Sequence, residues 1–132
     1  MPFYLPTYYL VWASLLFLGK HFVADFVLQT RWIVEGKENR EGWLAPLTVH
    51  AGIHALATLL IFLALAPDIA WMALVDFAIH FCVDRWKAIV ARRLDTTPQR
   101  KSFWLLFGID QTLHHLTDLG FVLAIAVARA AG

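Results

Sequence analysis

The sequence predicts an all-α integral membrane protein, organised as a transmembrane four-helix bundle with a short interfacial helix before the last span. Two observations predict this class. Apolar residues make up 60% of the 132 residues, and the mean hydropathy is +0.62. A soluble chain of this size has too little interior to bury so much apolar surface. Lipid is the simplest place for that surface, and we expect one transmembrane domain over residues 1–132.

Four segments are long enough to cross a bilayer, which takes about 20 predominantly apolar residues. They cover about 8–32, 46–66, 69–90 and 109–130. Only Pro67-Asp68 separates the second from the third, so these two should form a tight helical hairpin. The polar connections are Glu35–Gly42 and a longer one between Arg85 and Lys101. Because Thr97-Pro98 is a typical helix start, the run 102–107 is predicted to be a separate interfacial helix.

Basic residues are distributed unevenly between the connections. They gather in the first and third connections, and the hairpin turn has none. Since cytoplasmic loops carry the excess of Lys and Arg, both long connections are predicted to be cytoplasmic and both termini outside. We therefore expect a multi-pass protein of a bacterial inner membrane.

Each predicted span carries His or Asp side chains four residues apart. This spacing keeps two side chains on one helix face. At a rise of ~1.5 Å per residue, the four sets overlap in depth in the cytoplasmic half of the membrane. The expected metal ligands are these: His21, Asp25, His50, His54, His80, Asp84, Asp110 and His114.

A charged Asp in the bilayer centre costs a few kcal/mol unless it is compensated. Hydrogen bonding between the spans is one means of compensation, and a shared cation is another. His and Asp are good ligands for zinc, our first expectation, and for iron or manganese. Because the ligands outnumber the needs of one ion, we expect two or more. Lys20 is expected to pair with a site carboxylate or to mark an anionic ligand, and His115 to support the site.

The motifs resemble those of a known family. They are Ala24-Asp-Phe-Val-Leu-Gln-Thr30, His50 with His54, His80-Phe-Cys-Val-Asp-Arg-Trp-Lys87 and Asp110-Gln-Thr-Leu-His114. They resemble a bacterial family of small membrane proteins of unknown function, recognised by His-x-x-x-Asp-Phe-x-Leu-Gln and Asp-Gln-x-x-His. A more distant likeness is to inner-membrane metal-dependent hydrolases, themselves similar to the helical zinc phospholipase C and single-strand nuclease superfamily. That likeness implies metals on His-x-x-x-Asp helices.

Metals with mixed His and Asp ligands can activate water and hold a phosphoryl group. We therefore expect a metal-dependent hydrolase that acts on a phosphoester of a lipid or lipid-linked substrate at the cytoplasmic leaflet. Asp76 or Asp118 is the expected general base, and Lys87 the expected cationic partner of the substrate. Lys87 and three arginines near the mouth either hold phosphate or simply follow the positive-inside bias; the arginines are Arg85, Arg92 and Arg93.

Two other functions fit the same residues. A metal carrier or sensor would bind ions without chemistry, although the outer halves of the spans offer almost no polar lining for transport. A haem-binding protein is the third interpretation, which the abundance of Asp disfavours. No Gly-rich phosphate loop or nucleic-acid motif is present, so the expected partners are the lipid bilayer and a phosphate-bearing substrate.

Overall fold

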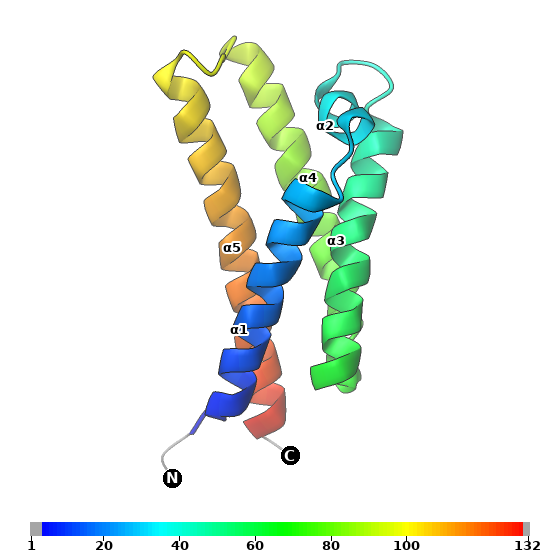
Figure 1. Ribbon diagram of the computed structural model, residues 1–132, viewed down its shortest axis with the longest axis vertical. Coiled ribbons are helices and arrows are strands. Elements are labelled where there is room, and N and C mark those ends of the chain that lie inside the picture. The colour runs from blue at the N-terminus through cyan, green and yellow to red at the C-terminus, as the bar shows by residue number, and fades with distance from the viewer. Residues whose placement is uncertain (1–3, 131–132) are drawn as a thin grey trace.

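The computed structural model describes residues 4–130, and within that range it is all-helical with no strand. Five α-helices follow one another (Figure 1): α1 (Thr7–Phe22), α2 (Arg31–Glu38), α3 (Leu44–Leu65), α4 (Met72–Arg93) and α5 (Lys101–Ala130). A π-helical turn, η1 (Val23–Val27), extends α1, and a 3-10 turn, η2 (Pro67–Ile69), joins α3 to α4.

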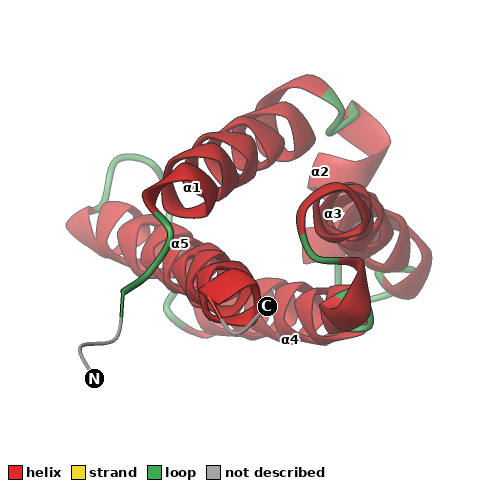
Figure 2. Cartoon of the chain, turned by 90° about the horizontal axis from the view of Figure 1, so that it is seen from below, coloured by secondary structure: helices red, strands yellow, loops and turns green. Residues whose placement is uncertain are grey.

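The four long helices are arranged as a ring, seen end-on in Figure 2. Helix α1 packs on α3 and α5, and α4 packs on the same two helices from the other side. The start of α1, the end of α5 and the α3–α4 turn lie at one end of the ring, which we call the termini end (Figure 1). Helix α2 and the α4–α5 connection lie at the other, the connection end, so both predicted polar connections are on one side.

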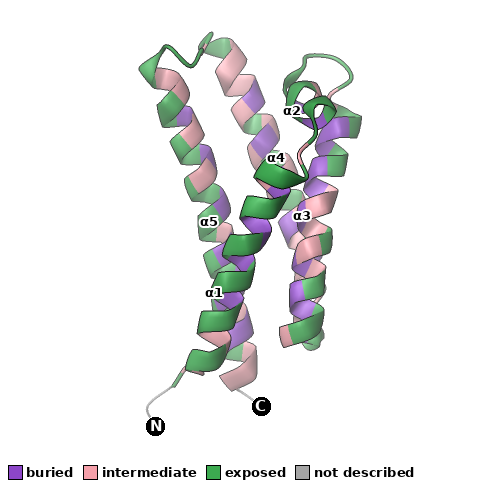
Figure 3. Cartoon of the chain, in the orientation of Figure 1, coloured by how far each residue is buried: buried purple, intermediate pink, exposed green. Residues whose placement is uncertain are grey.

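Among residues 4–130, three segments are long and apolar enough to cross a membrane: Thr7–Val27, Leu44–Leu65 and Lys101–Ala130. Helix α4 has 22 residues, the same length as α3. Helix α4 is not among the three segments because charged residues interrupt its apolar sequence: Asp76, Asp84, Arg85 and Lys87. Outward-facing positions of the bundle are exposed, while buried positions line its interior (Figure 3). The exposed side chains are largely Leu, Val, Phe and Trp, as expected for a surface in contact with lipid.

The first predicted span, 8–32, is wrong at its end. The helix stops at Val27, the chain turns, and Thr30 starts α2 by accepting a hydrogen bond from the Ile33 amide at 3.4 Å. Much of the expected polar connection is therefore helical. Helix α2 packs on α3 closely enough that a Cβ on Gly36 would lie 2.5 Å from Cγ of Pro46.

The expectation of a separate interfacial helix is also wrong. Residues 102–107 are helical, but α5 runs without a break from Lys101 to Ala130. Gly108 does not end the helix, because one glycine in a helix interior costs only about 1 kcal/mol relative to alanine. The expected helix is instead the first two turns of the last long helix.

An aromatic cluster fills the bundle towards the termini end. Phe17, Phe62 and Phe121 are almost fully buried, and their ring centroids lie 5.6–6.2 Å apart. Small and branched side chains such as Ala13 and Ile125 pack around them. Polar side chains are thereby concentrated in the remaining interior, nearer the connection end.

Candidate metal centre

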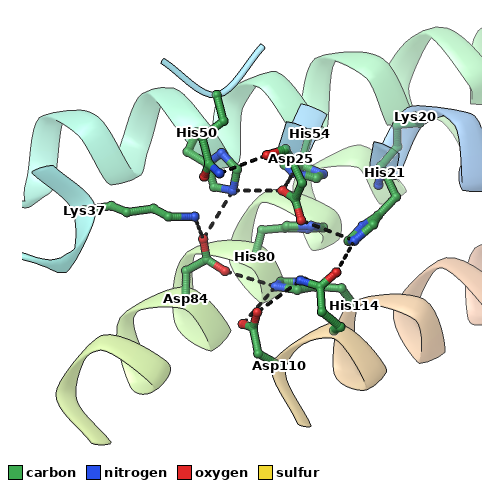
Figure 4. A network of polar contacts seen from close by, with 12 residues as sticks. Lys20, His21, Asp25, Lys37, His50, His54, His80, Asp84, Asp110 and His114 are labelled. Carbon is green, nitrogen blue, oxygen red and sulfur yellow. Dashed lines mark hydrogen bonds and ion pairs between the residues drawn. The ribbon is translucent and has the colours of Figure 1, made fainter. Parts of the chain in front are cut away.

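All eight expected ligands point into the bundle interior and contact one another there (Figure 4). Seven of them are buried, and Asp25 is half-buried. Each long helix contributes one His or Asp pair at i,i+4 spacing, so one face of every helix turns towards the centre. The structure brings these four pairs together as the spacing predicts.

Asp25 lies in the π-helical turn η1, where the helix is widened by one residue per turn. Its Oδ1 lies 2.9 Å from Nε2 of His54 and 3.4 Å from Nε2 of His50, and its Oδ2 lies 3.2 Å from Nε2 of His21. π-Helical turns inside α-helices occur frequently at functional sites. Here the turn lets one carboxylate face histidines from both α1 and α3.

Asp84 joins three helices. Its Oδ1 lies 3.0 Å from Nε2 of His114, and its Oδ2 lies 3.3 Å from Nε2 of His50. Asp110 approaches the same His114 nitrogen at 3.4 Å. Asp84, Asp110 and His114 can therefore direct three ligand atoms, all within 4.8 Å of one another, at a single ion.

A second three-residue group, formed by Asp25, His50 and His54, meets the same condition. Two further groups both contain His21. One combines it with His54 and His80, and the other combines it with His115 and Asp118. His115 is exposed, with its ring centroid 4.5 Å from that of His21. Nitrogen and carboxylate oxygen in groups of three are ligand sets that suit zinc, and also iron or manganese.

Several histidine rings have a hydrogen-bond partner at only one of their two nitrogens. His80 Nδ1 lies 2.8 Å from Oδ1 of Asp76, but its Nε2 is buried without a hydrogen-bond partner. The Nδ1 atoms of four further histidines are in the same state: His21, His50, His54 and His114. A buried polar atom without a partner costs about 1–3 kcal/mol. The centre therefore offers ring nitrogens well beyond those that its own hydrogen bonds use.

Lys20 forms an ion-paired group between the centre and the aromatic cluster. Its Nζ lies 2.9 Å from Oδ1 of Asp118 and 3.3 Å from Oδ2 of Asp76, and it donates to Oγ1 of Thr58 at 3.2 Å. The expected pairing of Lys20 with a site carboxylate is confirmed. The role of spare base does not fit Asp76, because His80 occupies one of its oxygens while Lys20 and Thr58 occupy the other.

Two more lysines reach the centre from the connection end. Lys37 on α2 lies 2.8 Å from Oδ2 of Asp84 and is buried. Lys87 on α4 lies 3.6 Å from Oδ2 of Asp110 and 3.7 Å from a carboxylate oxygen of Glu38. Sequence reasoning missed Lys37 because it treated this segment as a connection. The available signal was the i,i+4 pair of Ile33 with Lys37 after a Thr cap.

The charges of the centre do not balance. Five carboxylates face three lysines, which leaves two negative charges when every imidazole is neutral. Burying uncompensated charge is strongly unfavourable. One divalent cation would cancel the difference, and two protonated imidazoles would do the same. One divalent ion is thus enough to balance the charge, whereas the number of ligands suggested two or more ions.

Arg85 and Arg92 hold α2 in place, a role that the sequence did not indicate. Arg85 stacks over Trp43, with its guanidinium carbon 3.8 Å from a ring centroid, and donates to the Asn39 carbonyl. Arg92 donates to the carbonyls of Glu38 and Asn39. Cations favour the carboxyl end of a helix, where carbonyls lack partners. The expected phosphate-holding role of the two side chains stays a prediction.

Replacing Lys20 should destabilise the fold more than any exposed lysine does. Lys20→Met leaves Asp76 and Asp118 facing each other without their cation, and breaking a buried ion pair costs about 3–5 kcal/mol. Thermal unfolding in detergent should show a clearly lower Tm than Lys101→Met, whose side chain is exposed. Adding Asp118→Asn to Lys20→Met should recover part of the loss. Equal melting temperatures for the two single variants would contradict this role of Lys20.

A family model described as protein of unknown function (DUF3307) matches residues 14–130. The match includes all eight expected ligands and the three lysines that accompany them. Comparisons with curated proteins and with solved structures give no match. The chain belongs to the DUF3307 family of proteins of unknown function.

Proposed function

We propose that this protein is a membrane-embedded metal-dependent hydrolase that cleaves a phosphoester of a lipid or lipid-linked substrate at the cytoplasmic leaflet. The observation that carries the proposal is the unbalanced buried centre. With neutral imidazoles it has two excess negative charges, and five of its histidines each retain a buried ring nitrogen without a partner. A purely structural network would pair these groups with one another. A divalent cation would neutralise that charge, and the histidine and carboxylate groups around it are suitable ligands.

Two groups are the best candidates for the ligands, with zinc as the first candidate ion. Asp84, Asp110 and His114 form one, and Asp25, His50 and His54 form the other. Three protein ligands that leave a position open are typical of catalytic rather than structural zinc sites. The contact between Asp76 and His80 resembles the carboxylates that orient metal-binding histidines in known sites.

The metal would supply Lewis acidity and lower the pKa of a bound water. In the hydrolysis, the water oxygen forms a bond to phosphorus and the ester P–O bond breaks. The leaving oxygen takes up a proton and departs as an alcohol, while phosphate remains. Asp118 fits the base role better than Asp76, because its Oδ2 has no hydrogen-bond partner and lies 4.0 Å from Nδ1 of His21.

The alternative is a metal carrier or sensor without catalysis. The aromatic cluster of Phe17, Phe62 and Phe121 argues against transport, because it fills the bundle between the centre and the termini end. A sensor needs no such path and stays compatible with the site. Haem has little support, since the rings of His54, His80 and His114 stack directly at 3.9–4.2 Å and leave no gap for a macrocycle.

We also propose that α4 crosses the membrane, with both termini outside in a bacterial inner membrane. Its 22 residues span about 33 Å, close to the ~30 Å hydrocarbon thickness. Its acidic residues Asp76 and Asp84 are buried in the bundle rather than turned to lipid. The basic residues of α2 and of the α4–α5 connection gather at the connection end, which supports a cytoplasmic location for that end.

Cysteine labelling tests this topology. Single cysteines at Arg40 and Gln99, in a Cys82→Ser background, should react only with membrane-permeant reagents in intact cells. A cysteine at Pro67, in the α3–α4 turn, should react with impermeant reagents added outside. If an impermeant reagent added outside labels a cysteine at Arg40 or Gln99, the proposed orientation is refuted.

Hydrolysis should depend on Asp84. Asp84→Asn removes a ligand charge from the proposed centre and should reduce release of phosphate from lipid-phosphate substrates by at least about 100-fold. Asp95→Asn, an exposed acidic residue in the α4–α5 connection, is the matched control and should retain activity. Wild-type protein that binds metal but hydrolyses nothing in a broad lipid panel would reject the hydrolase and favour the sensor.

A further inference from the structure

A cavity of about 340 Å³ lies at the connection end between α2, α4 and α5. Its lining has two distinct parts. One part is polar and includes Lys37, Lys87 and Gln29, and the other is apolar and includes Val34, Phe103 and Phe107. Small-molecule sites commonly have volumes of about 300–1,000 Å³ and combine apolar walls with a few placed polar groups. This cavity meets both conditions.

The polar part of the cavity adjoins the candidate metal ligands. Lys37 contacts Asp84 at 2.8 Å, and Lys87 contacts Asp110 at 3.6 Å. These two carboxylates, with His114, form one of the three-ligand groups. An anion in the cavity would therefore meet two ammonium groups whose present carboxylate partners, Asp84 and Asp110, are proposed ligands of the cation.

The apolar part distinguishes between an inorganic anion and an amphiphile. Inorganic phosphate would use the two lysines and leave the wall of Phe103, Leu106 and Phe107 without a role. A phosphate joined to a hydrocarbon chain uses both parts. The volume suits a head group with the first carbons of its chain, and the exposed Trp104 on the same turns of α5 is typical of the headgroup layer.

We propose that this cavity binds the phosphate group of a phosphorylated lipid between Lys37 and Lys87, with the start of the chain against Phe103 and Phe107. The inference rests on the proposed function and names its substrate class and its pocket. It retains Lys87 as the cationic partner of the substrate and adds Lys37, which the sequence did not indicate. Glu38, whose carboxylate lies 3.7 Å from Lys87 Nζ, weakens binding of the phosphate by repulsion.

The test measures binding to the full-length metal-loaded protein by calorimetry in detergent. The probes are dioctanoyl phosphatidic acid, dioctanoylglycerol and inorganic phosphate. Lys87→Gln should weaken binding of phosphatidic acid roughly 10- to 100-fold, the equivalent of a hydrogen bond to a charged group. Glu38→Gln should strengthen it, and Lys101→Gln, an exposed lysine at the start of α5, should leave it unchanged. Phe107→Ala should weaken phosphatidic acid but not inorganic phosphate.

Several results would overturn the proposal that this cavity binds a phosphorylated lipid. Dioctanoylglycerol binding as tightly as phosphatidic acid would remove the role of the phosphate. Inorganic phosphate binding as tightly as phosphatidic acid, with no effect of Phe107→Ala, would assign the cavity to free phosphate. Unchanged binding in Lys87→Gln and Glu38→Gln would place the lipid elsewhere. Asp84→Asn separates the two proposals, because it should lose turnover while it still binds phosphatidic acid.

Discussion

The structure depends on the compensation of five carboxylates buried among four helices. Asp25, Asp76, Asp84, Asp110 and Asp118 are inside a bundle whose outer surface is apolar. Each would be costly alone in a low-dielectric interior. Lys20, Lys37 and Lys87 compensate three charges, and the histidines supply the contacts between helices. With neutral imidazoles two charges remain, and they are the physical reason to expect a cation in the centre.

This constraint also explains how the polar groups are distributed along the bundle. Lys20 is buried against Asp76 and Asp118 on the side of the aromatic cluster, where Phe17 lies 5.3 Å from its Nζ. Lys37 and Lys87 approach from the connection end and line a cavity. The centre is thus closed by aromatic rings on one side and bordered by a two-lysine pocket on the other. Access from the connection end suits a reaction at one leaflet better than passage across the membrane.

The features that depend on helical periodicity, namely the inward faces of the long helices, could be predicted from the sequence. The i,i+4 pairs, such as His80 with Asp84, identified the inward faces, and the basic residues marked a common end. What could not be predicted depends on tertiary contacts. Helix α2 is short and held by α3 and by Arg92, so Lys37 was assigned to a connection. Asp76 was taken for a free base because its pairing needs three helices together. The run 102–107 was predicted to be a separate helix, but it belongs to the continuous α5.

The central claim is that the buried centre binds a divalent metal ion. The most direct measurement is the metal content of full-length protein purified in detergent without chelator, determined by inductively coupled plasma mass spectrometry. The account predicts at least one divalent ion per chain, with zinc first, and its loss in His54→Ala or Asp84→Ala but not in His115→Ala. A content far below one ion per chain would contradict the account, because the excess charge would then be neutralised by protonated histidines.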